Sequence, residues 1–184
     1  MDFNDTRDEA AFRADARAWL ERTAERRAYA GETWKARYGE AEGLARAKEF
    51  QAKKHAAGFA AITWATEYGG RGGTPIQQVI YNQEESRFLV PPGYFEIGLG
   101  MCIPTLHAYA TEAQKQRYTP KALAGEEIWC QLFSEPAAGS DLAGLRTPAV
   151  KDGGDWVING QKIWTSGAHR ADWGVVVTRS DPSA

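Results

Sequence analysis

A loop of small and hydroxyl-bearing residues, SEPAAGSD at positions 134–141, has the composition of a ligand-binding loop. Pro136 ends the strand-like run before it, and the alanines and glycine that follow allow a ligand to lie against the backbone. Ser134 and Ser140 can each donate or accept a hydrogen bond there. The same residue types favour ordinary surface turns, so the composition of this loop alone favours a plain turn over a binding site.

Trp164, Thr165 and Ser166 form a second set of residues that could bind a planar ligand. They end the run NGQKIWTS, in which Asn-Gly predicts a tight type I′ turn and the following residues predict a return strand. An indole can stack on a flat heterocycle, and neighbouring hydroxyl groups can form hydrogen bonds to the edge of that heterocycle. Taken alone, Trp164 is better explained as an inward-facing core residue.

The sequence lacks the motifs of the common dinucleotide-binding, nucleotide-binding, serine-hydrolase and metal sites. No G-x-G-x-x-G run follows a strand and opens a helix, and neither a P-loop nor a G-x-S-x-G nucleophile motif occurs. No spacing of His, Cys or carboxylate residues indicates a metal site, and His55, His107 and His169 are isolated from one another. The sequence therefore predicts no Rossmann, P-loop, metal or serine-hydrolase site.

Charge, hydropathy and cysteine content indicate an ordinary cytoplasmic globular protein. The formal net charge of −2 gives no electrostatic reason to expect nucleic acid or an anionic membrane as a partner. No apolar run is long enough for a transmembrane helix, and the N-terminus lacks a signal-peptide or transit-peptide pattern. Cys102 and Cys130 lie among apolar residues, so we expect buried free thiols rather than a disulfide or a metal site.

Residues 1–125 have the pattern of an all-α domain. Phe12, Ala16, Trp19 and Thr23 recur at helical spacing and lie on one face of the first expected helix. Three arginines lie near the end of this helix: Arg22, Arg26 and Arg27. We explain them as solvated charges at a helix end, where the helix dipole favours positive charge, rather than as a basic binding patch. Four helical segments are predicted: about 8–27, about 33–57 with a break near Gly39 or Gly43, 74 to a point before Pro91, and 111 to near Pro120.

Two of these helices have defined starting signals. Thr74 and Thr111 are each followed three residues later by glutamine, which is the pattern of a capping box. Pro75 at the first helical position strengthens the first of these signals. We expect Ile76, Val79 and Ile80 to form the buried stripe of the helix that begins there.

Residues 126–184 change to a strand pattern. Residues 128–133 alternate with a period of two, Asp152-Gly153-Gly154 predicts one turn, and residues 173–178 predict a further buried strand. The predicted fold class is α+β, with an N-terminal all-α helical bundle (1–125) followed by the first strands of an incomplete antiparallel β-barrel (126–184). Three or four strands would leave an exposed edge and half a core uncovered, so we expect a C-terminally truncated protein.

The order of motifs resembles the acyl-CoA dehydrogenase family. Tyr68-Gly69-Gly70 follows Trp64, and a Glu112-Ala113-Gln114-Lys115 helix, the SEPAAGSD loop and NGQKIWTSG come next. The combination of the last two motifs at this spacing is highly specific, and the resemblance extends from about Trp19 to Asp181. The variants FSEP and WTSGAH are similar to bacterial branches of the family.

The resemblance implies FAD as the cofactor and assigns residues to it. Backbone groups of Gln131, Leu132, Phe133 and Ser134 would contact the pyrimidine edge of the flavin, where the Ser134 hydroxyl adds a hydrogen bond. Trp164 would lie against one ring face, with Thr165 beside it, and Ser166 would bond near flavin N5. Ser140 would contact the acyl-CoA substrate near its pantetheine arm. Donors at these edges stabilise an electron-rich reduced flavin.

The implied activity is that of an FAD-dependent acyl-CoA dehydrogenase, of which this chain is the N-terminal part. The complete enzyme would oxidise acyl-CoA to trans-2-enoyl-CoA, by α-proton abstraction and β-hydride transfer to flavin N5, and pass electrons to an electron-transferring flavoprotein. It would act as a homo- or hetero-oligomer in a bacterial cytoplasm. The isolated chain is expected to be inactive and to bind FAD weakly. Residues of the acyl-pocket floor could include Phe95, Ile97 and Leu99, although ordinary core packing explains them better.

The sequence departs from the family pattern mainly in length, since family members are roughly twice as long as these 184 residues. The catalytic base is therefore expected beyond Ala184. Glu84, Glu85 and Glu135 are candidates by residue type alone and none of them is assigned, because helix-face charges and a loop carboxylate explain them better. Ala137 and Ala65 stand where the family usually has glycine and proline, so Ala137 could be strained if its φ is positive.

Two other functions fit the same residues. One is a flavin oxidase or flavin-dependent monooxygenase on the same scaffold. The other is a non-catalytic short subunit that is completed by a partner chain. Peroxide release, or a need for externally reduced flavin, would separate the first from a dehydrogenase.

Overall fold

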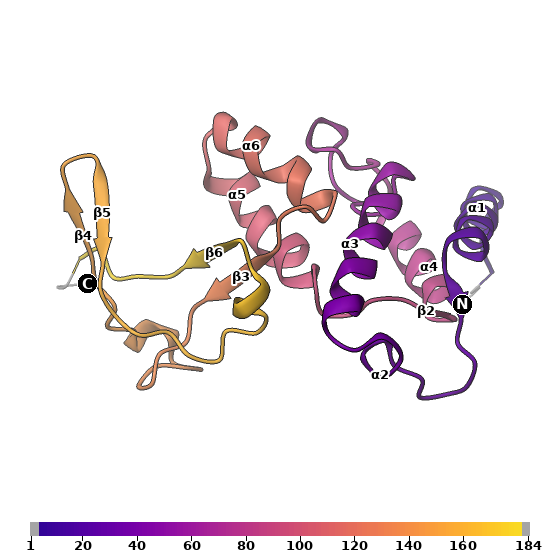
Figure 1. The fold of residues 1–184 in the computed structure, drawn as a ribbon. Coiled ribbons are helices and arrows are strands. Elements are labelled where there is room, and N and C mark those ends of the chain that lie inside the picture. Colours follow the sequence, from indigo (N-terminus) through magenta and orange to yellow (C-terminus); the bar gives the residue numbers. More distant parts are fainter. Residues whose placement is uncertain (1–3, 182–184) are drawn as a thin grey trace. The chain divides into compact units, whose positions relative to one another are not determined.

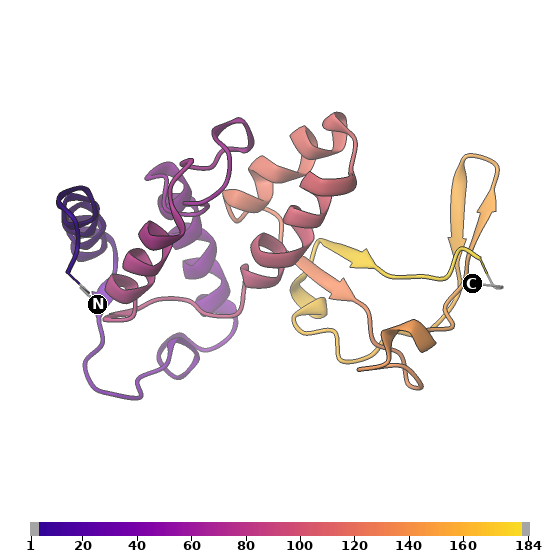
Figure 2. The ribbon, with the colours of Figure 1, turned by 180° about the vertical axis from the view of Figure 1, so that it is seen from behind.

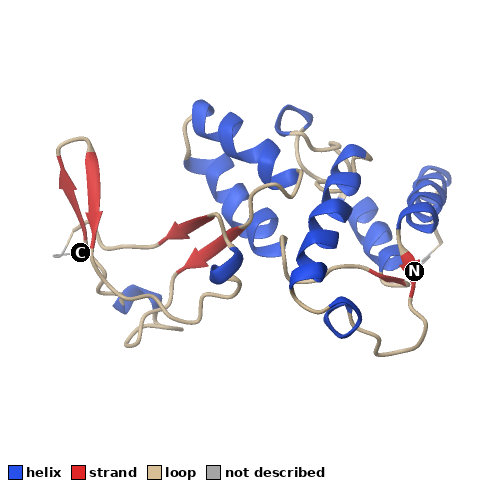
Figure 3. Ribbon diagram, viewed as in Figure 1, coloured by secondary structure: helices blue, strands red, loops and turns tan. Residues whose placement is uncertain are grey.

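The structure, a computed structural model, describes residues 4–181 and divides the chain into two units between Glu127 and Ile128 (Figure 1). The first unit is mainly helical and the second contains short strands joined by long connections (Figure 3). Within the described residues, no helix has both the length and the apolar character needed to cross a membrane. The predicted fold class, a helical domain followed by a few strands that do not close, is confirmed.

The first unit has its helices at α1 (Arg7–Thr23), α2 (Trp34–Tyr38), α3 (Ala41–Ala56), α4 (Pro75–Glu85), α5 (Ile103–Tyr109) and α6 (Glu112–Leu123). A short antiparallel pair joins β1 (Glu25–Arg26) to β2 (Phe88–Leu89). A 3-10 turn, η1, covers Thr66–Tyr68, and a π-helical turn, η2, covers Gly98–Cys102 immediately before α5. Helices α5 and α6 lie side by side (Figure 2).

Helix starts follow the sequence signals closely. Thr74 and Thr111 form the predicted capping boxes, and Thr6 forms a third at the start of α1. The expected end of α6 near Pro120 is wrong, because the helix continues to Leu123 with the proline inside it. Ala122 and Leu123 are buried, so the packing of the last turn outweighs the missing proline N–H.

The break in the second helical segment occurs at Gly39, which has φ +66°. Gly43 instead lies inside α3, and its carbonyl accepts a hydrogen bond from the Trp34 indole. Helix α1 ends at Thr23, earlier than expected, because the chain then enters β1. The solvated-helix-end explanation is therefore wrong for Arg26, which lies in β1, and for Arg27, whose guanidinium donates to the carbonyls of Phe88 and Glu32.

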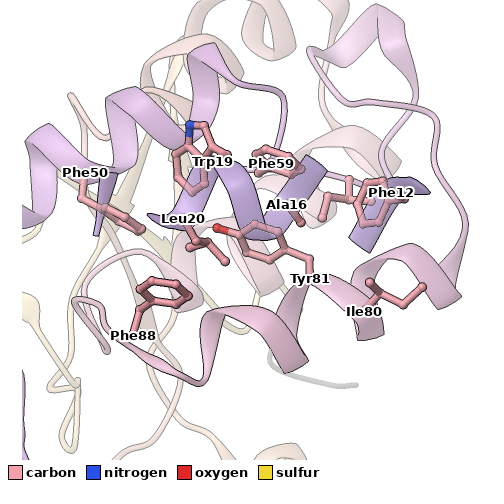
Figure 4. Packing of buried hydrophobic residues seen from close by; sticks show 10 residues of the cluster. Phe12, Ala16, Trp19, Leu20, Phe50, Phe59, Ile80, Tyr81 and Phe88 are labelled. Carbon is pink, nitrogen blue, oxygen red and sulfur yellow. The ribbon is translucent and has the colours of Figure 1, made fainter. Parts of the chain in front are cut away.

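An aromatic cluster forms the core of the helical unit, and Figure 4 shows its side chains pointing toward one another from several elements. Trp19 of α1 lies 5.2 Å from Phe59 and 5.7 Å from Phe50, between ring centroids. Tyr81 of α4 stacks on Phe59 at 5.1 Å. These contacts join α1, α3 and α4, and ring pairs of this kind add to the hydrophobic effect of burial.

Helix α4 contacts this core with a different face from the one expected. Ile80 and Tyr81 are buried, but Ile76 and Val79 are 49% and 48% exposed. The buried face also contains Glu84, a charged residue that apolar periodicity cannot identify. The predicted stripe is therefore correct only at Ile80.

The second unit contains two separate two-stranded sheets (Figure 3). Strand β3 (Trp129–Leu132) pairs with β6 (Trp173–Val176), and this pair is parallel rather than antiparallel as expected. Strands β4 (Ala149–Asp152) and β5 (Asp155–Ile158) form the antiparallel hairpin predicted at Gly153-Gly154. Strand β6 is only partly buried. Neither Cys102 nor Cys130 is in a disulfide and both are buried, which confirms the prediction for them.

No hairpin forms at Asn159-Gly160, so the predicted type I′ turn and return strand are wrong. The chain instead passes close to Thr147 at this point, and a Cβ at Gly160 would clash with the threonine side chain. Glycine is needed here for the close approach of two segments rather than for a tight turn.

A fully buried carboxylate joins α1 to α4. Glu84 accepts hydrogen bonds from Arg13 at 3.1 Å and from Arg17 at 2.9 and 3.0 Å, and Arg87 lies 3.2 Å away. The bond from Arg17 contributes most to lowering the pKa of Glu84 below its ordinary value. Removing one partner of such a network leaves buried polar groups unsatisfied.

We expect Glu84→Gln to lower the free energy of unfolding by about 2 kcal/mol, because a buried charged acceptor is lost and an amide N–H₂ then faces arginine donors. Chemical denaturation at pH 7 measures this. The matched control is Glu42→Gln, which removes an exposed pair with Arg46 and should cost less than about 0.5 kcal/mol. Equal effects of the two substitutions would contradict the role given to Glu84.

Candidate functional site

The two segments predicted to bind one planar ligand lie side by side in the second unit. The Ile163 N–H donates to the Ser134 carbonyl at 2.9 Å, and the Lys162 ammonium donates to the Phe133 carbonyl at 2.9 Å. The end of β3 is thereby joined to the residues just before Trp164. We call residues 131–134 together with 164–166 the cradle.

A buried ion pair adjoins the cradle in sequence, since Glu135 follows Ser134 and Lys162 lies two residues before Trp164. The Lys162 ammonium is 2.8 Å from Glu135 Oε1, and the two side chains are only 8% and 7% exposed. Glu135 also accepts the backbone N–H groups of Arg146 at 2.7 Å and of Thr147 at 3.0 Å. The hydrogen bond from Lys162 is the main cause that lowers the pKa of Glu135 to about 2, followed by those from Thr147 and Arg146. Glu135 is therefore a bound carboxylate and not a free base.

Trp164 is 85% exposed, so its explanation as an inward-facing core residue is wrong. It is the one non-glycine residue with positive φ, at +56°, in the part of the chain that the structure describes. This left-handed backbone costs roughly 1–2 kcal/mol for a residue with a Cβ. The expected strain at Ala137 is absent, since its φ is not positive. The strained position in this region is the one that presents the indole to solvent.

Gln131 contributes a polar atom that lacks a partner within the protein. Its side-chain oxygen is buried and has no hydrogen-bond partner among the described residues. Buried polar atoms are normally hydrogen-bonded, and an exception often marks a ligand or water position. This orphaned acceptor lies on β3, the strand that leads into the cradle.

The remaining predicted residues occupy the surface around these segments. Ser134 and Thr165 are partly exposed, whereas Ser166 is exposed. Ser140 is exposed on the loop beyond a tight turn, in which Glu135 and Ala138 exchange backbone hydrogen bonds. No hydrogen bond among the described residues joins Ser140 to Trp164 or Ser166. The structure therefore brings the two segments of the cradle together, and within the described residues no hydrogen bond joins Ser140 to them.

Carboxylates considered as bases in the helical unit are engaged in ion pairs. Glu85 lies 2.7 Å from the Lys54 ammonium and accepts the Tyr81 hydroxyl at 3.0 Å, and Glu84 binds arginines. Among residues 4–181, no group of three or more His, Cys, Asp or Glu side chains could hold a metal ion. These carboxylates hold elements together, which agrees with assigning none of them as the catalytic base.

A cavity of about 360 Å³ lies in the helical unit beside the π-helical turn. Its lining includes two of the three residues named for the acyl-pocket floor, Phe95 and Leu99, together with Phe50 and Lys54. Ile97 is not part of this lining. Phe95 is also buried against Tyr94, so ordinary core packing accounts for it as well.

The Tyr68-Gly69-Gly70 turn and the helix that begins at Glu112 contact each other. The Tyr68 ring stacks on His107 at 4.1 Å, and the Lys115 ammonium donates to the Tyr68 hydroxyl at 3.4 Å. Partial burial lowers the pKa of His107, which bonds to the Thr119 hydroxyl at 2.9 Å. These two motifs are therefore structural contacts within the helical unit.

Lys162 has no sequence signal that singles it out, although it links Phe133 and Glu135 to the stretch that leads into Trp164. Lys162 has one polar and one apolar neighbour in sequence, so nothing nearby indicates that its side chain is buried. Only its partner Glu135, twenty-seven residues away, reveals the role. The family motifs contain both residues, within SEPAAGSD and NGQKIWTS, and this was the available signal.

Comparison with known proteins gives the same family for both units. The sequence profile described as "Acyl-CoA dehydrogenase, N-terminal domain" matches residues 6–126, and "Acyl-CoA dehydrogenase, middle domain" matches residues 130–184. Acyl-CoA dehydrogenase FadE34 of Mycobacterium tuberculosis is 46% identical over 127 residues, which are 69% of this chain and 18% of that protein. Acyl-CoA dehydrogenase IpdE1 of the same organism is 43% identical over 126 residues, 68% of this chain and 33% of that protein.

Solved structures also resemble the whole chain. A chain of the ChsE4-ChsE5 complex from Mycobacterium tuberculosis superimposes with a TM-score of 0.79 and 32% identity. The match covers 100% of this chain and 45% of that one. This chain thus spans a third or less of the length of FadE34 and IpdE1 and under half of the ChsE4-ChsE5 chain. By the profile matches and these relatives, the chain belongs to the acyl-CoA dehydrogenase family.

Proposed function

We propose that these residues are the N-terminal part of an FAD-dependent acyl-CoA dehydrogenase, with a helical domain at 1–125 and a partial flavin-binding β domain at 126–184. The observation that carries this proposal is the cradle, in which Trp164, exposed and at a strained backbone position, directly follows residues that are hydrogen-bonded to the segment after β3. The family membership supports the reaction, which converts acyl-CoA to trans-2-enoyl-CoA.

The residues of the cradle fit a flavin. Gln131 has a buried acceptor without a protein partner, as expected if a ligand N–H is its partner. Backbone groups of Gln131, Leu132, Phe133 and the Ser134 hydroxyl form a polar edge, and the exposed Trp164 indole offers a flat apolar face for stacking. When bound, FAD supplies the acceptor for the hydride that leaves the substrate.

The chain's own residues would cover one face of the flavin ring, stabilise the charge that develops on it and bind the substrate. Trp164 excludes water from one face of the ring, with Thr165 beside it. Ser166 supplies hydroxyl and backbone N–H donors at the position where negative charge develops during reduction. Ser140, on its separate exposed loop, binds the substrate near the pantetheine arm. The glutamates considered within the chain are already paired, so we propose that none of them is the base that removes the α-proton and that another part of the complete enzyme supplies it.

Assembly and electron transfer are proposed from the relatives. The resemblance to a chain of the ChsE4-ChsE5 complex supports a hetero-oligomer for the whole protein. We propose that the reduced enzyme passes its electrons to an electron-transferring flavoprotein, and that it works in a bacterial cytoplasm. The acyl-CoA substrate is proposed from the family.

We expect Ser166→Ala, made in the complete gene product, to slow flavin reduction by acyl-CoA roughly tenfold or more, because a hydrogen bond to the developing negative charge is lost. Stopped-flow absorbance of the flavin measures this rate, and substrate titration should show binding within about twofold of the wild type. Ser140→Ala should give the opposite result, with weaker acyl-CoA binding and a nearly unchanged rate. An unchanged rate of reduction in Ser166→Ala would show that the role given to this hydroxyl is wrong.

We expect Trp164→Ala to weaken FAD binding about tenfold, because a stacking ring pair contributes roughly 0.5–1.5 kcal/mol beyond its buried area. Its midpoint of thermal unfolding without cofactor should stay close to that of the wild type, because the indole is exposed. The control is Trp156→Ala on β5, which removes another exposed indole, 55% exposed, outside the cradle. Equal FAD affinities of the two variants would contradict the stacking role.

A further inference from the structure

We infer that Lys162 and Glu135 are positioning residues that hold the two segments of the cradle in their binding arrangement before the cofactor arrives. The inference rests on the proposed flavin site and goes further, since it concerns how the free protein maintains that site. Neither side chain is assigned a contact with the flavin. Their effect passes through the backbone of Phe133, Ser134 and Ile163.

The Lys162 ammonium connects both sides of the site directly. It lies on the segment that leads to Trp164, and it donates to the Phe133 carbonyl at 2.9 Å and to Glu135 Oε1 at 2.8 Å. The next residue, Ile163, donates its N–H to the Ser134 carbonyl at 2.9 Å. Three hydrogen bonds therefore join the two short segments.

Glu135 links this junction to a third part of the chain. Its two oxygens accept the backbone N–H groups of Arg146 and Thr147 as well as the Lys162 ammonium. Thr147 in turn lies against Gly160, at the start of the segment that leads to Trp164. The carboxylate thus holds the loop around 146–147 and the cradle at fixed separations.

The regular structure of this region is too sparse to hold the cradle by itself. Residues 159–165 belong to no strand, and β3 ends at Leu132, before the contact with Ile163. A buried ion pair adds to stability only if its hydrogen bonds are well satisfied, and in some proteins such pairs fix a unique arrangement of the chain. The Lys162–Glu135 pair lies where regular strand pairing has ended, which is where side chains are needed to fix the arrangement of the two segments.

The strained backbone of Trp164 supports the same conclusion. On its N-terminal side, Lys162 and Ile163 are bound to the end of β3. On its C-terminal side, the Thr165 carbonyl accepts the Ala168 N–H at 3.3 Å in a turn. A left-handed residue persists only when its surroundings hold it there. Release of the N-terminal side would allow Trp164 to relax and the indole to change direction.

The carboxyl group of Glu135 should titrate near pH 2 in the wild-type protein, and its pKa should rise toward the ordinary value of 4.5 in Lys162→Met. Because the folded pKa is depressed, this group's contribution to stability is complete above about pH 4.5 and disappears as the pH falls toward 2. Carbon-13 NMR of the side-chain carboxyl measures both values. A wild-type pKa near 4.5 would contradict the contact between Glu135 and Lys162.

The decisive experiment compares Lys162→Met with Lys54→Met in the complete gene product, by fluorescence titration with FAD and by hydrogen exchange of the cofactor-free protein. Lys54→Met is matched, because it breaks a partly buried pair with Glu85 in the helical unit. Lys162→Met should raise the Kd for FAD at least tenfold and increase exchange at the Ile163 amide at least tenfold. Lys54→Met should leave both quantities unchanged. Lys162→Arg, which keeps the charge, should recover part of the affinity.

Wild-type FAD affinity in Lys162→Met would overturn the inference, even if that variant is less stable. If Lys162→Met does not fold, hydrogen exchange of the wild-type protein without FAD tests the inference instead. Its Ile163 amide should already be protected without FAD, and protection that appears only after FAD is added would overturn the inference. If the wild type does not bind FAD, the proposed function fails, and exchange at Ile163 in the variants still tests the positioning role.

Discussion

A buried pair between a lysine ammonium and a glutamate carboxylate organises the strand-containing unit. Lys162 and Glu135 lie where β3 has ended and the return segment has no regular pairing. Hydrogen bonds along a sheet normally fix the separation of two segments, and here side-chain charges and a few backbone groups perform that task. Both oxygens of the Glu135 carboxylate accept hydrogen bonds, from the adjacent Arg146 and Thr147 on one segment and from Lys162 on another, so the pair is satisfied despite its burial.

The helical unit is held together by a different balance of forces. Its aromatic cluster joins three helices by apolar contact, and the arginines around Glu84 add a charged junction between α1 and α4. The buried aromatic cluster lies entirely within this unit. The family motifs in it, such as Tyr68-Gly69-Gly70, maintain contacts between helices and turns, whereas the motifs in the second unit build a surface that faces solvent.

The difference between the two units has a functional meaning for an enzyme of this family. A site made of loops needs a rigid framework, because a binding surface without fixed geometry loses affinity to the entropy of ordering. In this chain the pair of Lys162 and Glu135 joins the residues on either side of the cradle, and Trp164 is held in a backbone conformation that it would not otherwise prefer. The geometry of the cradle is thus defined by a few long-range hydrogen bonds.

Local residue patterns by themselves determined the features whose causes are local. The capping boxes at Thr74 and Thr111 and the turn at Gly153-Gly154 depend on residues within a few positions of one another, and all were predicted correctly. The motif order also identified the family, because the order of segments is itself a property of the sequence. The residues of the cradle could be named for the same reason.

Tertiary structure alone decided the features that depend on distant partners. Asn159-Gly160 forms no hairpin, and Gly160 instead lies against Thr147. Ile76 and Val79 are exposed because Ile80 and Tyr81 face the core. The parallel pairing of β3 with β6 and the burial of Lys162 against Glu135 likewise follow from segments far apart in the chain. A residue's own neighbours in sequence carry no record of such partners, so only the folded chain shows which charge is buried and which indole is exposed.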